Sequence, residues 1–123
     1  MNKLIEARYS PYDFDKSVEL DTETAELLLT AATMAPSSFN EQPWRFHYAL
    51  RQNKEGFKKL YDVILDGNKP WANDVSMLIL GVSETKFSKN GKTNKHAFYD
   101  LGQSVFAMLM QATELDLFAH QMG

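Results

Sequence analysis

The feature that most constrains the fold is an apolar helical segment that runs from about Asn94 to Leu115. At 1.5 Å per residue, a helix of this length spans roughly 30 Å. Apolar side chains at helical spacing form one face, and others lie around the rest of the circumference: Phe98, Leu101, Val105, Met108, Leu109 and Ala112 against Phe106, Ala107 and Met110. Such a helix needs burial on more than one face. It is therefore either a central core helix or a helix partly buried against a second subunit.

Apolar patterns elsewhere predict strands. Residues 44–51 alternate, which predicts a half-buried strand with two distinct faces: Trp44, Phe46, Tyr48 and Leu50 against Arg45, His47, Ala49 and Arg51. Residues 75–82 are almost continuously apolar, which is typical of a strand that is covered on both faces and central to its sheet. Residues 116–122 predict a last strand.

Helical spacing predicts three further helices. A short helix over residues 3–8 precedes a second one, which begins after the capping residue Asp21 and ends before Pro36. A third covers residues 54–65, and Gly67-Asn68 is expected to end it in a left-handed turn. This order predicts a mixed α/β (α+β) fold, a sheet flanked by helices with a long central helix.

Composition narrows the functional classes. A chain of 123 residues forms one domain at most, over residues 1–123. Its net charge of -3, without a lysine or arginine stripe, gives no basis for binding nucleic acid. The absence of cysteine excludes disulfides and thiolate sites. No apolar run reaches membrane-spanning length and the amino terminus lacks signal-peptide order, so we expect a cytoplasmic protein without a membrane partner.

The segment Ala35–Phe46 carries the densest cluster of candidate binding groups. Two prolines fix the backbone, and four short polar side chains can donate and accept hydrogen bonds, namely Ser37, Ser38, Asn40 and Gln42. A rigid loop with uncharged polar groups suits a flat heterocycle. The same residues also suit an ordinary connector, which is the commoner use of such turn-forming residues.

Other catalytic schemes find little support in the sequence. The three histidines are too scattered for a helical metal motif, so no metal site is expected: His47, His96 and His120. Ser37 and Ser38 lack the Gly-x-Ser-x-Gly arrangement of a serine hydrolase. We therefore assign no side chain as a catalytic acid, base or nucleophile.

Several separated motifs together resemble the nitroreductase family of FMN-dependent oxidoreductases. Arg8-Tyr9-Ser10 stands near the start, the run from Pro36 to Phe46 follows, and Asp100-Leu101-Gly102 begins the long helix. Gly67-Asn68 with Trp71 adds a fourth match. The matches occur in the family's order along the whole chain, and their combination is more specific than any one of them. The resemblance implies the amino-terminal part of a nitroreductase-like fold, with the carboxyl-terminal part missing.

The resemblance also implies roles for individual residues. Arg8 and Ser10 match residues that hold the FMN phosphate, and Tyr9 matches a backbone contact to the flavin. Asn68 matches a residue that reads the polar edge of the flavin ring. The loop residues match positions that contact a flavin bound mainly by the other subunit of a homodimer: Pro36, Ser37, Ser38 and Asn40. Gln42 either belongs to this contact or anchors the loop.

The family's reaction passes hydride from NAD(P)H through FMN to an electron-poor acceptor such as a nitroaromatic or a quinone. Two departures from the family stand out. Tyr12 occupies a position where relatives commonly carry a basic residue, and relatives continue well beyond Gly123. The alternative interpretation is therefore a shortened, non-catalytic dimeric or interaction protein derived from the same fold.

Overall fold

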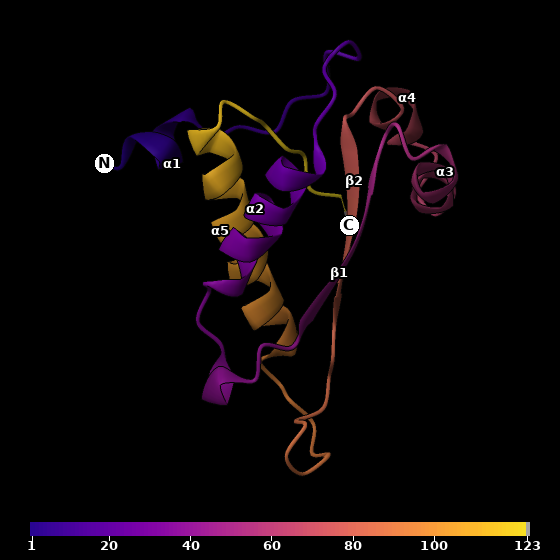
Figure 1. The fold of residues 1–123 in the computed structure, drawn as a ribbon. Helices are drawn as coiled ribbons and strands as arrows, with labels where there is room; N and C mark the ends of the chain where they lie inside the picture. The colour runs from indigo at the N-terminus through magenta and orange to yellow at the C-terminus, as the bar shows by residue number, and fades with distance from the viewer. Residues whose placement is uncertain (123) are drawn as a thin grey trace.

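The computed structural model describes residues 1–122 and contains helices on both sides of a small sheet (Figure 1). The elements in chain order are α1 (Lys3–Ala7), α2 (Thr22–Thr33), the 3₁₀ turn η1 (Ser38–Asn40), β1 (Trp44–Leu50), α3 (Lys54–Asp62), α4 (Lys69–Ala72), β2 (Met77–Ser83) and α5 (Ala97–Glu114). This arrangement confirms the predicted mixed α/β fold with a long helix. None of the described helices has the length and apolar character that crossing a membrane requires.

The sheet consists of two antiparallel strands, with Trp44 opposite Ser83 and Leu50 opposite Met77. The predicted alternation holds at the start of β1, where Trp44 is buried, but it fails at the end. There Ala49 is buried and Tyr48 is exposed. The reason is that α3 covers this end of the sheet and packs Phe57 against Ala49.

The strand predicted over residues 75–82 is present as β2, but the prediction that it is central and covered on both faces is wrong. The strand begins only at Met77, after a bend at Ser76. Within the described residues the strand pairs with β1 alone, and Leu80 and Val82 remain exposed. The continuous apolar run of this strand is therefore typical of a strand in a larger, covered sheet, which these two strands alone do not form.

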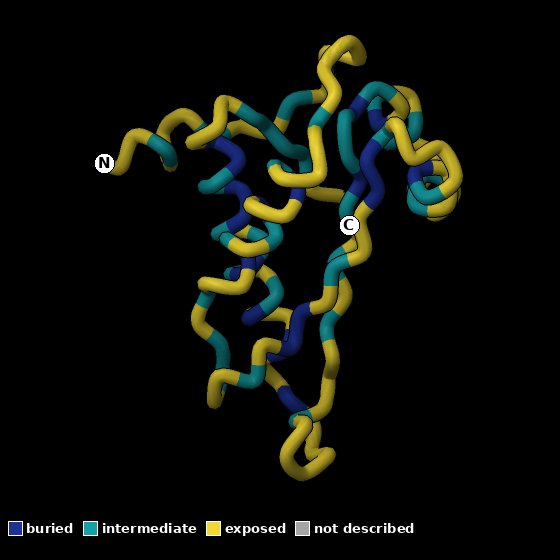
Figure 2. Tube along the Cα trace, in the orientation of Figure 1, coloured by how far each residue is buried: buried dark blue, intermediate teal, exposed yellow. Residues whose placement is uncertain are grey.

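The helix α2 begins where the sequence predicts it. The Asp21 carboxylate accepts a hydrogen bond of 2.7 Å from the Thr24 backbone N–H, and the bonds from Thr24 hold the Asp21 pKa below its usual 3.8. The inner face of α2 packs on α5, in a cluster of Leu28, Ala32, Met108 and Ala112. Buried residues gather along this contact and again where the strands meet α3 (Figure 2).

The sequence predicts that α5 is either a central core helix or a helix partly buried against a second subunit. Its buried face includes Met108 and Leu109, so it is a core helix. Phe98 and Tyr99 are about 70% exposed and Phe106 is exposed as well, so these described residues leave a second face uncovered. The helix begins three residues later than predicted, because residues 94–96 form a turn in which the Asn94 side chain accepts a bond from the His96 N–H.

Three further details differ from the prediction. The helix predicted over residues 54–65 ends at Asp62, and Asn68, at φ -99°, does not form a left-handed turn but precedes α4. Residues 116–122 form no strand. Asp116 has φ 55°, which turns the chain back, and Phe118 then packs on Tyr9 with 4.7 Å between the ring centroids. Side-chain packing on the amino-terminal segment thus replaces strand pairing.

Candidate functional site

The segment after α1 brings two candidate phosphate-binding groups together. Arg8 Nη1 lies 3.4 Å from Ser10 Oγ, so the guanidinium and the hydroxyl face the same space. Arg8 is half-buried and Ser10 is exposed. None of the salt bridges among the described residues uses Arg8, which keeps its charge available to an anion. A guanidinium beside a hydroxyl is a donor set that phosphate oxygens accept.

Tyr9 and Asn68 line the same cavity of about 830 Å³. This cavity lies between the sheet and α5 and is lined mainly by apolar side chains, including those of Phe46 and Leu101. Asn68 is half-buried, and its side chain does not cap α4, although the residue stands at the helix start. A mainly apolar cavity of this size with a few polar groups at its wall is typical of cofactor sites.

The cavity also meets an aromatic cluster that the sequence does not reveal. Trp71, from α4, stacks on Phe14 at 5.9 Å and lies 4.7 Å from the His120 ring. His120 Nδ1 is 2.9 Å from the Pro11 carbonyl oxygen. The bond between His120 and Pro11 spans 109 positions in the chain, so no local pattern could have predicted it.

The loop between α2 and β1 has a defined conformation. Ser38–Asn40 form a single 3₁₀ turn, in which the Asn40 N–H donates to the Ser37 carbonyl at 3.0 Å. The Ser37 hydroxyl accepts a bond of 2.9 Å from the Gln42 N–H. Pro36 is exposed, whereas Pro43 is fully buried and fixes the entry into β1.

This loop stores backbone strain. Phe39, Asn40 and Gln42 have φ values of 55°, 55° and 50°, in the left-handed region that favours glycine. Non-glycine residues adopt this conformation at a cost and keep it only where the surrounding contacts enforce it. Strain of this kind clusters at binding sites, which makes the loop a candidate contact.

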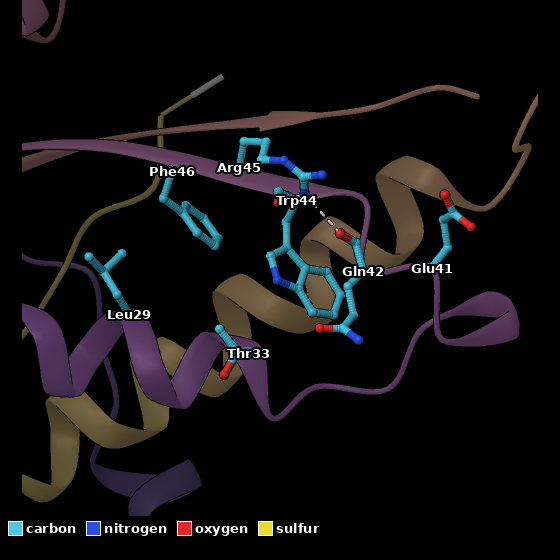
Figure 3. Close-up of a pocket in the computed structure, with 7 residues that line it drawn as sticks. All are labelled: Leu29, Thr33, Glu41, Gln42, Trp44, Arg45 and Phe46. Carbon is cyan, nitrogen blue, oxygen red and sulfur yellow. Dashed lines mark hydrogen bonds between the residues drawn. The ribbon is translucent and has the colours of Figure 1, made fainter. Parts of the chain in front are cut away.

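Gln42 lies at the edge of a second, shallower pocket of about 560 Å³ (Figure 3). The pocket lies between α2, the loop and the start of β1, and its other labelled residues are Leu29, Thr33, Glu41, Trp44, Arg45 and Phe46. Arg45 Nη1 donates to the Gln42 carbonyl oxygen at 3.0 Å. The Gln42 side chain donates to the Asn40 carbonyl at 3.4 Å, so Gln42 stabilises the loop.

The structure divides the predicted site residues into two groups. Arg8, Tyr9 and Ser10 lie beside α1, and Asn68 lies beside α4, all toward the top of Figure 1. The loop from Pro36 to Gln42 lies at the lower end of α2, away from both. One chain therefore does not bring the two groups together. The residues described here also contain no cluster of three or more groups that could hold a metal ion.

Asp100 makes a contact with the loop that the sequence did not reveal. Its carboxylate is 2% exposed, and Oδ2 accepts a hydrogen bond of 3.0 Å from the Ser38 N–H. The motif Asp100-Leu101-Gly102 marked the position, but nothing in it indicated a partner 62 residues earlier.

The model of the nitroreductase family matches residues 5–76. A protein of Bacillus subtilis (strain 168), YdgI, which carries the name of an NAD(P)H nitroreductase, is 38% identical over 58 residues, covering 47% of this chain and 27% of its own length.

Solved structures match over more of the chain. A crystal structure of an oxidoreductase containing FMN superposes with a TM-score of 0.91 and 32% identity, over 100% of this chain and 63% of that one. A nitroreductase family protein of Clostridium difficile 630 superposes with a TM-score of 0.71 and 28% identity, over 94% of this chain and 64% of its own. The chain thus spans less than two thirds of each of these relatives.

Proposed function

This chain belongs to the nitroreductase family, and from that premise we propose that it acts as an FMN-dependent oxidoreductase. The proposed reaction transfers hydride from NAD(P)H to an electron-poor acceptor such as a nitroaromatic or a quinone. Reduced nicotinamides are supplied in the cytoplasm, which is where we expect the reaction. The observation that carries the proposal is the convergence of Tyr9 and Asn68 on one cavity, with the Arg8 and Ser10 pair beside Tyr9.

The residues present fit FMN in chemical type. Arg8 and Ser10 offer a positive charge and a hydroxyl to a phosphate. Asn68 offers both a donor and an acceptor to the edge of a heterocycle, and the apolar wall beside Leu101 suits the flat ring. When bound, FMN would accept hydride and pass it on. The chain's own groups would bind the ring, orient it and exclude water from it.

We further propose a homodimer in which each FMN lies between subunits. Pro36, Ser37, Ser38 and Asn40 lie on a rigid loop away from Arg8 and Asn68 in the same chain (Figure 1). In a dimer, the loop of one subunit would reach the cavity of its partner. The small-molecule acceptor would then bind against the exposed face of the ring.

The first test is the visible spectrum of the purified chain titrated with FMN. We expect tight binding, a flavin spectrum and bleaching when NADH or NADPH is added without oxygen. A colourless chain that takes up no FMN would contradict the proposed function.

The variant Arg8→Met tests the phosphate site. Loss of a charge-assisted bond should weaken FMN binding about tenfold or more. Riboflavin lacks the phosphate, so its affinity should not change. The matched control is Lys3→Met, which removes an exposed cation from the neighbouring helix. Equal losses for FMN and riboflavin would show that Arg8 does not contact the phosphate.

The non-catalytic interaction protein remains the second candidate. The exposed apolar residues Tyr99 and Phe106 of α5 favour it, because they lie outside the lining of the cavity proposed for the flavin and suit an interaction surface. A folded dimer in light scattering that has no measurable FMN affinity would support this candidate against the enzyme.

A further inference from the structure

The buried carboxylate of Asp100 lacks the partner that such groups usually have. It lies in the first turn of α5 and is 2% exposed. Buried charges are normally paired with a cation, yet the salt bridges of the described chain involve only the lysines at positions 58, 59 and 69. The carboxylate instead accepts bonds from the Ser38 N–H at 3.0 Å and from the Gln103 side chain at 3.5 Å.

The position of Asp100 reduces the cost of burying its charge. Near the amino-terminal end of α5, the helix dipole favours a negative group. The long helix also holds the carboxylate rigidly, since α5 packs along α2 in the main apolar cluster. Asp100 is therefore a buried, rigidly held hydrogen-bond acceptor for the loop that contains Ser38.

The loop needs such a fixed point. Phe39 and Asn40 follow Ser38 directly, and both have left-handed backbone conformations. The other side chains that hold the loop are less buried: the Ser37 hydroxyl, the Arg45 guanidinium and the Glu41 carboxylate, which accepts a bond from the Ser88 N–H. Among these anchors, Asp100 alone combines burial with a formal charge.

We propose that Asp100 is a positioning residue, which holds the loop Ser37–Gln42 in the conformation that contacts the flavin of the partner subunit. This inference rests on the proposed function. Asp100 does not touch the cofactor. It acts through the Ser38 backbone N–H, and its loss frees the strained residues behind that bond to leave their left-handed conformations.

The test compares Asp100→Ala and Asp100→Asn with Ser104→Ala. Ser104 is the matched control, because it lies one turn later on α5, is fully buried and donates 2.8 Å to the Ala32 carbonyl of α2 rather than to the loop. Amide hydrogen exchange, followed by NMR, reports on Ser38 and its neighbours with or without FMN. FMN affinity and the thermal midpoint are measured on the same samples.

We expect Asp100→Ala to accelerate exchange at the Ser38 amide about tenfold or more and to weaken FMN binding by a similar factor. Asp100→Asn should have intermediate effects, because its carboxamide oxygen can still accept the bond without a charge. Ser104→Ala should lower the thermal midpoint without changing Ser38 exchange or FMN affinity. If Asp100→Ala does not fold, the comparison of Asp100→Asn with Ser104→Ala decides the question.

Two kinds of failure are distinguishable. A wild-type chain that binds no FMN contradicts the proposed function, and exchange at Ser38 then decides alone whether Asp100 fixes the loop. A wild-type chain that binds FMN, combined with unchanged Ser38 exchange in both Asp100 variants or equal changes in Ser104→Ala, overturns the role of Asp100.

Discussion

Phe39 combines an exposed side chain with a strained backbone conformation. Its side chain is 91% exposed, and its one aromatic neighbour is Phe87, edge-on at 5.9 Å. Its backbone has φ 55°, which costs a non-glycine residue about 1 kcal/mol or more. Stability alone therefore gives little reason for a large aromatic residue at this position.

Comparing Phe39→Gly with Phe39→Ala isolates the backbone strain, since neither variant keeps the ring. We expect the glycine variant to be at least as stable as the alanine variant, by up to about 1 kcal/mol in urea unfolding. The same pair at Glu26, an exposed position within α2, should show the opposite order, with alanine more stable by about 1 kcal/mol. If the alanine variant were more stable than the glycine variant at both positions, the backbone strain inferred at Phe39 would be contradicted.

At the scale of elements, the contact between α2 and α5 carries much of the core. Leu28 is 4% exposed and packs with Met108 and Ala112, while its neighbour Leu27 is 43% exposed on the outer face of α2. The Ser104 side chain adds a hydrogen bond to the Ala32 carbonyl within the same contact. The inner face of α2 therefore supports the rigid helix end from which the loop departs.

The matched pair Leu28→Ala and Leu27→Ala tests whether the inner face of α2, and not its outer face, packs in the core. We expect Leu28→Ala to lower the free energy of unfolding by about 2–5 kcal/mol, because it leaves a cavity in the core. Leu27→Ala should cost less than about 1 kcal/mol in the isolated chain. Chemical denaturation at a low protein concentration provides the measurement, and equal losses would show that α2 does not face the core as described.

How far the sequence predicts these elements depends on whether their signals are local. The Asp21 cap and the start of β1 at Trp44 follow from a few neighbouring residues, and both were predicted. The strand predicted over residues 116–122 was not found, because an apolar pattern does not say whether a sheet edge lies within reach.

The same distinction applies to the candidate site. The motifs identified Arg8 and Asn68 as site residues, and these assignments stay predictions until binding is measured. The bond from Ser38 to Asp100 spans 62 positions, so it could be found only after folding had brought the two together. The left-handed residues of the loop were also beyond prediction, since Phe39 carries no intrinsic preference for that conformation.

At the scale of the whole molecule, the described chain leaves large apolar side chains of α5 exposed to solvent. Phe98 and Tyr99 are about 70% exposed at the start of α5. Phe106, about two helical turns further along, is exposed as well. Large exposed apolar residues on one helix are typical of an interaction surface. Their position on the helix whose first turn holds the loop links the proposed dimer contact to the proposed flavin contact.

The variant Tyr99→Glu tests the proposed dimer at an exposed residue of α5 that lies outside the lining of the flavin cavity. A charge placed in an apolar interface should weaken dimerisation at least tenfold in sedimentation or light-scattering measurements. Tyr48→Glu is the matched control, because Tyr48 is also an exposed tyrosine but lies on β1 rather than on α5. Dimers that dissociate equally in both variants, or in neither, would argue against an interface at α5.

The separation of Arg8 and the loop within one chain has a consequence for mixed populations of subunits. In a dimer that pairs an Arg8 variant with a loop variant, one site inherits both defects and the other inherits neither. Two separately inactive proteins, co-expressed, would regain one working centre per mixed pair. Complementation between alleles, rather than simple recessive loss, is the genetic behaviour that this arrangement of residues leads us to expect.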